Sequence, residues 1–470
     1  MSDHDDVPSL TPRLPWWVAR PSDDRLFIVY ARAYAVATIL RLTLPDAMQT
    51  SWLPATVTQS VGALVLAATG GLLGWVLCAS GGLGAIAFLE DQLTQSAYLL
   101  ACALAAIGCF LGPASGRGDR MGRGLPQTVR VLTVLVYLLA GFHKLNADFL
   151  NPAVSCANAG LRALATHGQR SPLLPEMVLS WPHWPKLFLA AELGLPWLVL
   201  WRPRPAVVAL AAFHLPLTII FAPSFAITMM TGWICLLGER GITAVASTLR
   251  KKWPTIVGVG LIPAIASTWT FFPARTASDP DWRVKEALLW CVFVALVAAW
   301  WQHRDVFADR DPWRGPNPAR SVTGIFALAF CLHGLTPYLG LGFHRTGAML
   351  SNLRIDRGCE NHLLIPASIR LADPYIVIEE IRFAPERAVP GFEEDVETRL
   401  WSMAALWRAR AHWCAKHPEP LPIAATHGGR RYDIANLCAP DGWPWSEPLL
   451  PHHRRFQVNL TARCPEACIH

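Results

Sequence analysis

The chain has 470 residues, of which 53% are hydrophobic and 16% charged, and its mean hydropathy is +0.30. This balance excludes an ordinary soluble domain and predicts a polytopic membrane protein. The net charge of +7 comes mostly from Arg in short loops between apolar runs, where membrane topology explains it better than a nucleic-acid partner does.

Residues 1–25 begin the chain with a polar segment that has no apolar core followed by a small-residue cleavage site. We therefore expect no signal peptide and a cytoplasmic N-terminal tail. Residues 26–341 form a predicted all-α polytopic membrane helical bundle in the inner (plasma) membrane. The predicted spans are 26–44, 56–90, 96–112, 127–144, 185–201, 205–222, 224–238, 254–272, 284–302 and 321–341.

The run 56–90 is too long for one span and contains the pair Gly70-Gly71, which favours a tight helical hairpin. Basic residues collect in cytoplasmic loops, and only a hairpin brings all the basic loops of this chain to one side of the membrane. The prediction is about eleven crossings with a cytoplasmic N-terminus. The basic residues are Arg13, Arg20, Arg25, Arg117, Arg120, Arg123, Arg202, Arg204, Arg240, Arg250, Lys251, Lys252, Arg304, Arg310, Arg314 and Arg320.

Two segments are then expected outside the cytoplasm. The outer loop 145–184 is too long for a tight connection and is broken by prolines, so it is either part of a site or a simple surface loop. Residues 342–470 are richer in charge and form a predicted C-terminal extracytoplasmic α+β soluble domain. It has an expected strand over 375–383 and an amphipathic helix over 393–416, whereas residues 440–470 have no assigned structure.

The twelve Cys divide into two groups by their surroundings. Six lie in apolar runs, where packing is their expected role. Of the other six, Cys464 and Cys468 have a weak metal-like spacing, but no matching Cys/His pair is nearby, which favours a disulfide or free thiols and no metal. The first group is Cys78, Cys102, Cys109, Cys235, Cys291 and Cys331, and the second is Cys156, Cys359, Cys414, Cys438, Cys464 and Cys468.

Lys144 lies at the outer end of the predicted span 127–144. In one interpretation its ammonium snorkels to the headgroups, and in the other it is functional, because ionisable groups at membrane depth are costly. Desolvation favours a neutral amine that can act as a base, whereas an ion pair with Asp148, one turn later, would hold the Lys charged. His143 points about a quarter-turn away and need not share the site.

His214 and Glu192 are two further ionisable side chains within apolar runs. His214 is either a hydrogen-bonded helix-packing residue or part of a polar site that faces the bundle interior. Glu192 is a third buried candidate, with a helix–helix hydrogen bond as its structural alternative.

Three stretches of the chain form recognisable motifs. They are Tyr137-Leu-Leu-Ala-Gly-Phe-His-Lys-Leu-Asn-Ala-Asp-Phe149, then Phe213-His214 with Phe221 and Phe225-Ala-Ile-Thr-Met-Met, and Gly347-Ala-Met-Leu-Ser-Asn-Leu-Arg354 with Glu360-Asn-His-Leu-Leu364. The first two resemble the vitamin K-dependent γ-carboxylases and their bacterial relatives, the horizontally transferred transmembrane (HTTM) domain proteins, and together cover roughly residues 25–240. The third resembles a segment that follows the membrane part in bacterial relatives, and for its Asn352, Asn361 and His362 we favour a structural role, capping the outer face of the bundle.

The resemblance implies an integral membrane carboxylase of the carbon–carbon lyase class. In this family a Lys base deprotonates a reduced, vitamin K-like quinone, and the oxygenated quinone removes a proton from a Glu side chain of a secreted peptide or protein, to which CO2 adds. Lys144 and His214 match the family's site positions and are the expected catalytic residues. Membrane lipid, a quinone and a secreted peptide or protein are the expected partners.

Ser96 departs from the family pattern. Where the family has Asn-Asn-His before Tyr-Leu, this chain has Thr94-Gln95-Ser96-Ala97-Tyr98-Leu99, and Ser does not transfer protons near neutral pH as an imidazole does. Two alternatives therefore stay open. One is a non-catalytic membrane protein for maturation, export or immunity of a secreted peptide, and the other is a transporter with broken helices.

Overall fold

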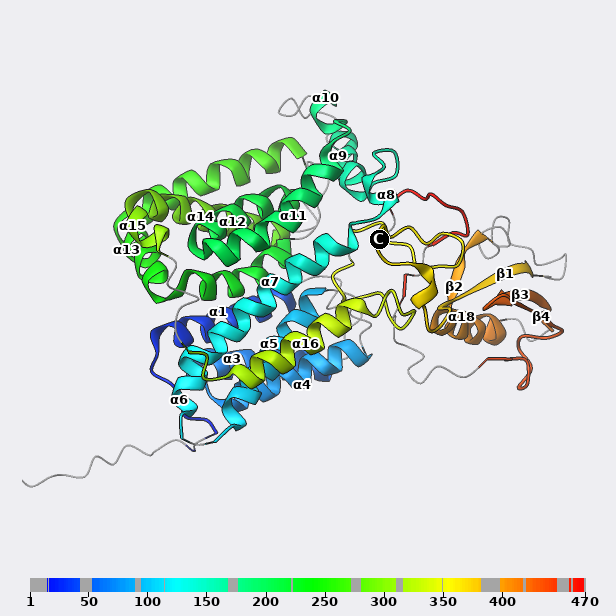
Figure 1. Ribbon diagram of the computed structural model, residues 1–470, viewed down its shortest axis with the longest axis horizontal. Helices are drawn as coiled ribbons and strands as arrows, with labels where there is room; N and C mark the ends of the chain where they lie inside the picture. The colour runs from blue at the N-terminus through cyan, green and yellow to red at the C-terminus, as the bar shows by residue number, and fades with distance from the viewer. Residues whose placement is uncertain are drawn as a thin grey trace, which may run out of the picture.

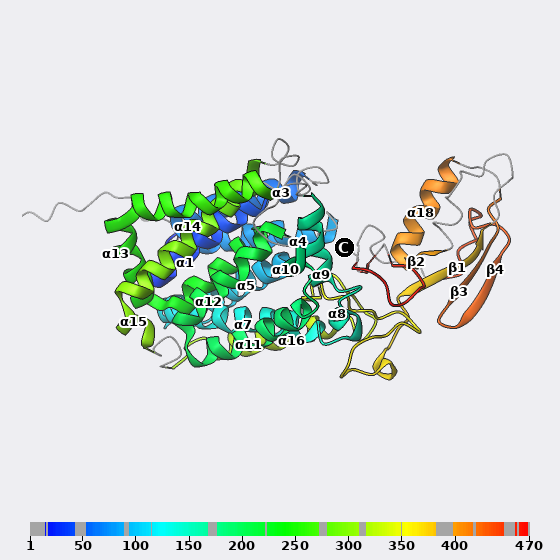
Figure 2. The ribbon, with the colours of Figure 1, turned by 90° about the horizontal axis from the view of Figure 1, so that it is seen from above.

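The computed structural model consists of a helical bundle with a small sheet-containing domain at one end (Figure 1, Figure 2). The described residues are 15, 17–42, 53–88, 94–113, 115–167, 176–220, 223–271, 280–309, 316–348, 350–381, 398–416, 420–445, 456–457 and 460–468. The helices of the bundle and its outer loop are α1 (Arg25–Leu42), α3 (Leu53–Thr69), α4 (Leu72–Phe88), α5 (Thr94–Leu111), α6 (Arg117–Asp119), η1 (Arg120–Gly124), α7 (Leu125–His143), α8 (Ala147–Leu150), α9 (Cys156–His167), α10 (Glu176–Leu179), α11 (Trp184–Trp201), α12 (Pro203–Ile220), α13 (Pro223–Phe271), α14 (Pro280–Gln302), α15 (Arg304–Ala308) and α16 (Arg320–Leu335).

The predicted hairpin over 56–90 is confirmed, because α3 and α4 are joined by a turn of two residues. Gly70 has a φ of 67°, a left-handed conformation that costs Gly little. The two helices also touch closely through glycine, since a Cβ on Gly74 would lie 2.7 Å from the Leu66 backbone. Small residues thus let two apolar helices pack with their backbones in contact.

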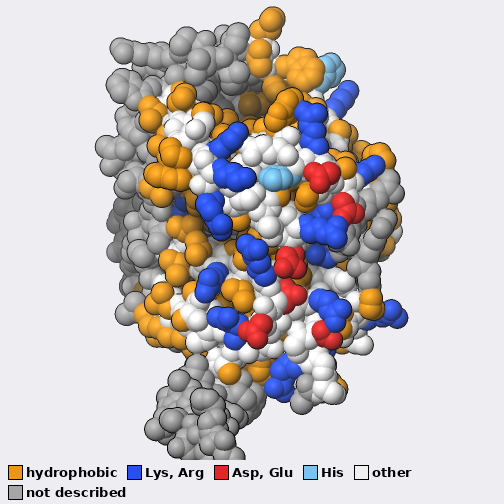
Figure 3. Space-filling model, turned by 90° about the vertical axis from the view of Figure 1, so that its left-hand side faces the viewer, with side chains coloured by type: hydrophobic (Ala, Val, Ile, Leu, Met, Phe, Trp, Pro, Cys, Tyr) orange, Lys and Arg blue, Asp and Glu red, His pale blue; other side chains and the backbone are white. Residues whose placement is uncertain are grey.

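The basic loops meet at the end of the bundle that faces away from the C-terminal domain. Arg25 at the start of α1 donates a hydrogen bond to Thr243 of α13 (3.3 Å), and Arg202 donates to the carbonyl of Ala308 in α15 (2.5 Å). Figure 3 shows Lys and Arg side chains spread over this end, with apolar side chains along its flank. The exposed basic residues include Arg123, Arg240, Arg250, Lys251, Lys252, Arg304 and Arg320.

The region around α13 differs from the prediction. The sequence predicts two spans, 224–238 and 254–272, joined by a loop, whereas Pro223–Phe271 is a series of helical segments interrupted by non-helical φ/ψ at Gly238 and Lys252. The helix changes direction at Gly238, whose φ is 65°, and again at Lys252. Glycine has no Cβ to oppose a positive φ, so the chain bends there and resumes a helix at once. The predicted basic loop is therefore a helical segment between two kinks.

Within the described part of the chain, three helices are long and apolar enough to cross a bilayer, namely Thr94–Leu111, Arg117–His143 and Val284–Gln302. Leu72–Ala87 and Arg320–Leu335 are shorter apolar helices. Large apolar side chains are exposed on several bundle helices, as expected of a surface that contacts lipid. They include Leu64, Leu83, Trp197, Ile262, Ile325 and Leu328. The number of crossings stays a prediction.

Among its described residues, the C-terminal part contains a short 3-10 helix, η3 (Ala367–Ile369), one α-helix and a four-stranded antiparallel sheet in the order β2-β1-β3-β4. The predicted helix over 393–416 is wrong at its start, because Leu400–Ser402 is a strand paired with Tyr375–Val377, and the helix begins at Met403. Residues 393–397 lie outside the described residues. The elements are β1 (Tyr375–Ile381), β2 (Leu400–Ser402), α18 (Met403–Lys416), β3 (Ile423–His427) and β4 (Arg430–Ile434).

Cysteine pairing follows the division seen in the sequence. All six Cys outside the apolar runs form disulfides, and the six within those runs are free. Cys464 and Cys468 are thus disulfide-bonded, each to a distant partner, so the C-terminal tail is attached both to the outer loop and to the segment after α16. The pairs are Cys156–Cys468, Cys359–Cys464 and Cys414–Cys438.

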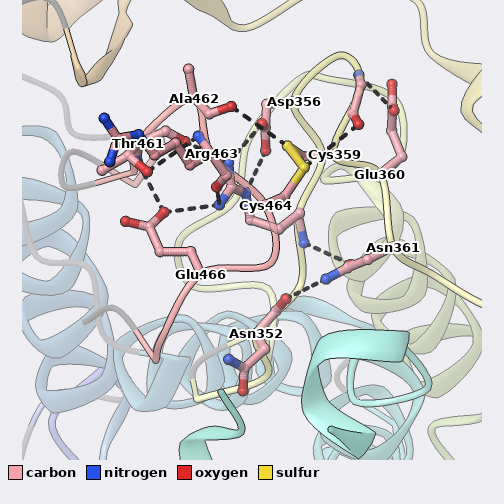
Figure 4. Close-up of a disulfide and its surroundings, with 12 residues drawn as sticks. Asn352, Asp356, Cys359, Glu360, Asn361, Thr461, Ala462, Arg463, Cys464 and Glu466 are labelled. Carbon is pink, nitrogen blue, oxygen red and sulfur yellow. Dashed lines mark hydrogen bonds and ion pairs between the residues drawn. A yellow bond between two sulfur atoms is a disulfide. The ribbon is translucent and has the colours of Figure 1, made fainter. Parts of the chain in front are cut away.

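A buried ion-pair cluster lies beside the Cys359–Cys464 disulfide (Figure 4). Arg354 binds the Asp356 carboxylate through two nitrogens, at 2.7 and 2.8 Å, and a third nitrogen lies 2.9 Å from Glu466 Oε2. This fork geometry is the strongest form of Arg–carboxylate pairing. The cluster and the disulfide together hold the tail against the segment that connects the bundle to the sheet.

Candidate functional site

A cavity of about 70 Å³ lies near the end of the bundle that faces the C-terminal domain. Helices α5, α7, α11, α12 and α13 contribute to its walls, together with the outer loop and the segment after α16. Most of the walls are apolar, and the charged side chains among the residues that line it are Lys144 and Glu192. The residues are Thr94, Val136, Ala140, Lys144, Phe149, Cys156, Ala157, Phe188, Glu192, Leu217, Phe225, Gly347 and Leu350.

Lys144 and Glu192 form a buried ion pair on this cavity. Lys144 Nζ lies 2.8 Å from Glu192 Oε2 and 3.1 Å from Oε1, and the two side chains are 8% and 10% exposed. Nζ also lies 5.7 Å from the centre of the Phe149 ring, within reach of a cation–π attraction. Lys144 therefore turns inward, whereas snorkelling requires a side chain that extends to the surface.

The ion pair differs from the local pair considered in the sequence. Lys144 is the C-cap of α7, and Asn146 begins the separate helix α8 by accepting a hydrogen bond from the Phe149 backbone (2.7 Å). Lys144 and Asp148 are therefore not on one helix, and the spacing i,i+4 no longer brings them together. Within the described residues Lys144 pairs with Glu192 of α11 instead.

Gly141 sets the distance between α7 and α11. A Cβ at this position would lie 2.8 Å from Leu193 Cδ2 and 3.2 Å from the carbonyl carbon of Glu192. A larger residue would require the Leu193 side chain to shift or α11 to move away, so glycine permits the close approach. Lys144 follows three residues later and meets Glu192 across this contact.

His214 lies in a second polar group, one side chain away from the cavity. Its Nε2 is 2.8 Å from Tyr137 Oη, which also accepts a hydrogen bond from Trp233 Nε1 at 3.2 Å. Because Tyr137 accepts from the indole, its own hydrogen is available for the imidazole. His214 does not line the cavity, but Phe225 does, and the two rings are 5.4 Å apart. His214 and Lys144 are thus neighbours of one cavity without direct contact.

His143 points away from the ion pair, toward the segment after α16. Its Nδ1 is 2.8 Å from Tyr338 Oη, and its Nε2 donates to the carbonyl of Thr346 at 3.1 Å. The ring is fully buried between α7 and the segment after α16. It joins these two parts and does not share the cavity.

Asn352, Asn361 and His362 hold the segment after α16 on the ends of α7 and the outer loop. Asn361 donates to the carbonyl of Asn352 (2.7 Å), and Asn352 accepts from the Cys156 backbone (2.7 Å). His362 Nε2 donates to the carbonyl of Phe142 (3.0 Å). These contacts are structural and leave the cavity to other residues.

Burial lowers the pKa of His362 below its ordinary value, although the hydrogen bond to Phe142 acts in the opposite direction. The imidazole Nδ1 accepts hydrogen bonds from the backbone of Leu364 (3.2 Å) and Ile365 (3.0 Å). A proton on Nδ1 would face these two donors. The contact between the segment after α16 and the end of α7 therefore requires the neutral imidazole of His362.

In the stretch 94–99, the residue that lines the cavity is Thr94 and not Ser96. Ser96 is nevertheless buried. Gln95 is also buried, and its Oε1 has no hydrogen-bond partner among the described residues. No side chain of this stretch supplies the imidazole that the family pattern has there.

Comparisons of the chain with protein-family models, curated proteins and solved structures find no match. The sequence singled out Lys144, Glu192 and His214, and the structure brings the first two into contact. Reasoning from the sequence alone missed Tyr137 and Gly141 as site residues. Their signal was helical spacing, since positions 137, 141 and 144 recur every three or four residues and share one face of α7.

Proposed function

We propose that the protein spans a membrane, with its basic end in the cytoplasm and its C-terminal domain outside. Two observations support this orientation. The basic loops gather at one end of the bundle, and all disulfides lie in the outer loop or the C-terminal domain, while Cys of the apolar helices are free. Disulfides persist in oxidising compartments outside the cytoplasm, and positive charge is retained inside.

We propose further that the cavity binds the hydroxyl end of an apolar, weakly acidic ring such as a reduced quinone, and removes its proton. The observation that carries this proposal is the buried Lys144–Glu192 pair at the wall of an otherwise apolar cavity. The Glu192 carboxylate can accept a proton, and the Lys144 ammonium beside it stabilises the anion that remains. An ion pair thus performs the deprotonation that a free amine would otherwise perform.

The residues of the cavity fit the chemistry of a quinol, but the cavity must enlarge before it can hold one. Ligand pockets usually measure ~300–1,000 Å³, and this cavity measures about 70 Å³. Phe149, Phe188 and Phe225 line it, and rotation of these side chains would enlarge it. Carboxylation of a Glu side chain on a secreted peptide or protein rests on the family resemblance, and it would follow the proton transfer proposed here.

The test uses the full chain in lipid nanodiscs with reduced and oxidised menaquinone. We expect saturable binding and quinol-dependent incorporation of labelled CO2 into a Glu-containing peptide, both reduced at least tenfold by Lys144→Met and Glu192→Gln. Asp148→Asn, which alters a neighbouring buried carboxylate, is the matched control and should retain binding. Binding that is unchanged in both variants removes the ion pair from the mechanism. Binding without CO2 incorporation favours the non-catalytic alternative.

A further inference from the structure

A second cavity lies between α5 and α16, near the end of the bundle that faces the C-terminal domain. Its volume is about 410 Å³, within the range of ~300–1,000 Å³ typical of small-ligand sites. One wall is the stripe of α5 from Ala97 to Leu104, and the other is the stripe of α16 from Phe326 to His333. Residues on each stripe are spaced by three or four, so each wall extends about 10 Å along its helix.

Basic and hydrogen-bonding side chains lie at one end of this groove. They are His333, Thr336, His344 and Arg345, and no Asp or Glu is among the described residues that line it. Arg345 is 7% exposed and donates to the carbonyl of Ile86 at 3.2 Å. The groove thus has long apolar walls and a cationic end, which matches a molecule with an apolar chain and an anionic group.

The outer side of α16 indicates where such a molecule would come from. Ile325, Leu328 and Leu332 are 64%, 61% and 56% exposed on this helix. In a bilayer these side chains contact acyl chains, and a groove beside them is open to the same lipids.

We infer that this groove binds an anionic phospholipid of the surrounding bilayer. One acyl chain lies between α5 and α16, and the phosphate is held by Arg345 and the neighbouring His side chains. A guanidinium binds phosphate oxygens through charge-assisted hydrogen bonds, which distinguishes an accessible anionic headgroup from a zwitterionic one. The inference rests on the membrane insertion proposed above and is independent of any chemistry at Lys144.

The experiment uses the full chain in nanodiscs that contain a trace of phosphatidylglycerol or phosphatidylcholine with a photoreactive acyl chain. After irradiation, peptide mass spectrometry locates the labelled residues. We expect labelling to concentrate on 97–104 and 326–333, with about tenfold preference for phosphatidylglycerol, the effect of one charge-assisted contact. Arg345→Gln removes the positive charge but keeps a polar, unbranched side chain at a backbone position with φ 70°, and it should reduce labelling to the phosphatidylcholine level.

Two controls separate the groove from general lipid contact. Arg123→Gln removes a 61% exposed basic side chain at the opposite end and should leave labelling unchanged. Ala101→Phe fills the groove and should abolish its labelling, whereas Val61→Phe on a 44% exposed position should not. Equal labelling by the two lipids, preference unaffected by Arg345→Gln, or labelling spread over all exposed helices overturns the inference. Labelling by a photoreactive fatty acid in place of the phospholipid also overturns it. Loss of quinone binding does not affect this result.

Discussion

Removing one partner of the Lys144–Glu192 pair should destabilise the protein far more than removing both. At 2.8 Å two unit charges attract by about 6 kcal/mol at an effective dielectric constant of about 20. A single substitution, Lys144→Met or Glu192→Leu, loses this attraction and leaves the other charge buried, so we expect each to cost about 3–5 kcal/mol. The double substitution leaves no buried charge and should be nearly neutral. The coupling free energy between the two sites, which is the difference between the double cost and the two single costs, is then about 6–10 kcal/mol in magnitude.

The measurement is equilibrium unfolding in mixed micelles, followed by circular dichroism, for the four members of the cycle. Glu192→Gln and Asp148→Asn provide a matched pair, because each replaces a buried carboxylate by the corresponding amide. We expect a large loss of stability for the first and a small one for the second. Additive single-mutant costs, or equal losses for the two amides, would show that Lys144 does not depend on Glu192.

Three further substitutions test the surroundings of the pair. Gly141→Ala should displace the Leu193 side chain or α11 and lower the free energy of unfolding by about 1–3 kcal/mol, and an unchanged stability would contradict the close approach. Tyr137→Phe should cost about 1 kcal/mol for each hydrogen bond lost to His214 and Trp233, with His214 still buried; a neutral effect would exclude those bonds. Folding lowers the pKa of His362 below 6.5. The contribution of its neutral imidazole to the free energy of unfolding is therefore complete above that pH and is lost as the pH falls. The hydrogen-exchange protection factors of residues 350–381, which are corrected for the slower intrinsic exchange at lower pH, should decrease between about pH 7 and 5. In His362→Gln this pH dependence should be weaker, and an equal dependence would refute the role of the ring.

Features that depend on short stretches of sequence were predictable. The hairpin at Gly70 follows from a run too long for one span and from a residue that accepts a positive φ. Gly238, at the end of a predicted span, also has a positive φ but marks a kink, because helix formation resumes directly after it. Leu400–Ser402 fits a helical stripe, and only pairing with β1 makes it a strand. Such long-range pairing leaves little trace in the strand's own residues.

The sequence identified which ionisable residues belong to the candidate site, but it did not identify which of them contact one another. Ionisable residues in apolar runs are conspicuous, which is why Lys144, Glu192 and His214 stood out. Local spacing then proposed Asp148 as the partner of Lys144. The pairing depends on where α7 ends, since a helix that stops at residue 143 separates Lys144 from Asp148 and directs it across to α11.

The motif at the end of α7 makes two sets of contacts because its side chains leave the helix in different directions. Tyr137, Gly141 and Lys144 face α11, α12 and α13, where they form the polar groups around the cavity. His143 points toward the segment after α16 and binds it, and Gly347 of that segment lines the cavity. The outer segment is therefore both held by α7 and part of the wall that α7 shapes. A change that loosens this segment should alter the cavity even when the ion pair is intact, so the two sets of contacts are one functional unit.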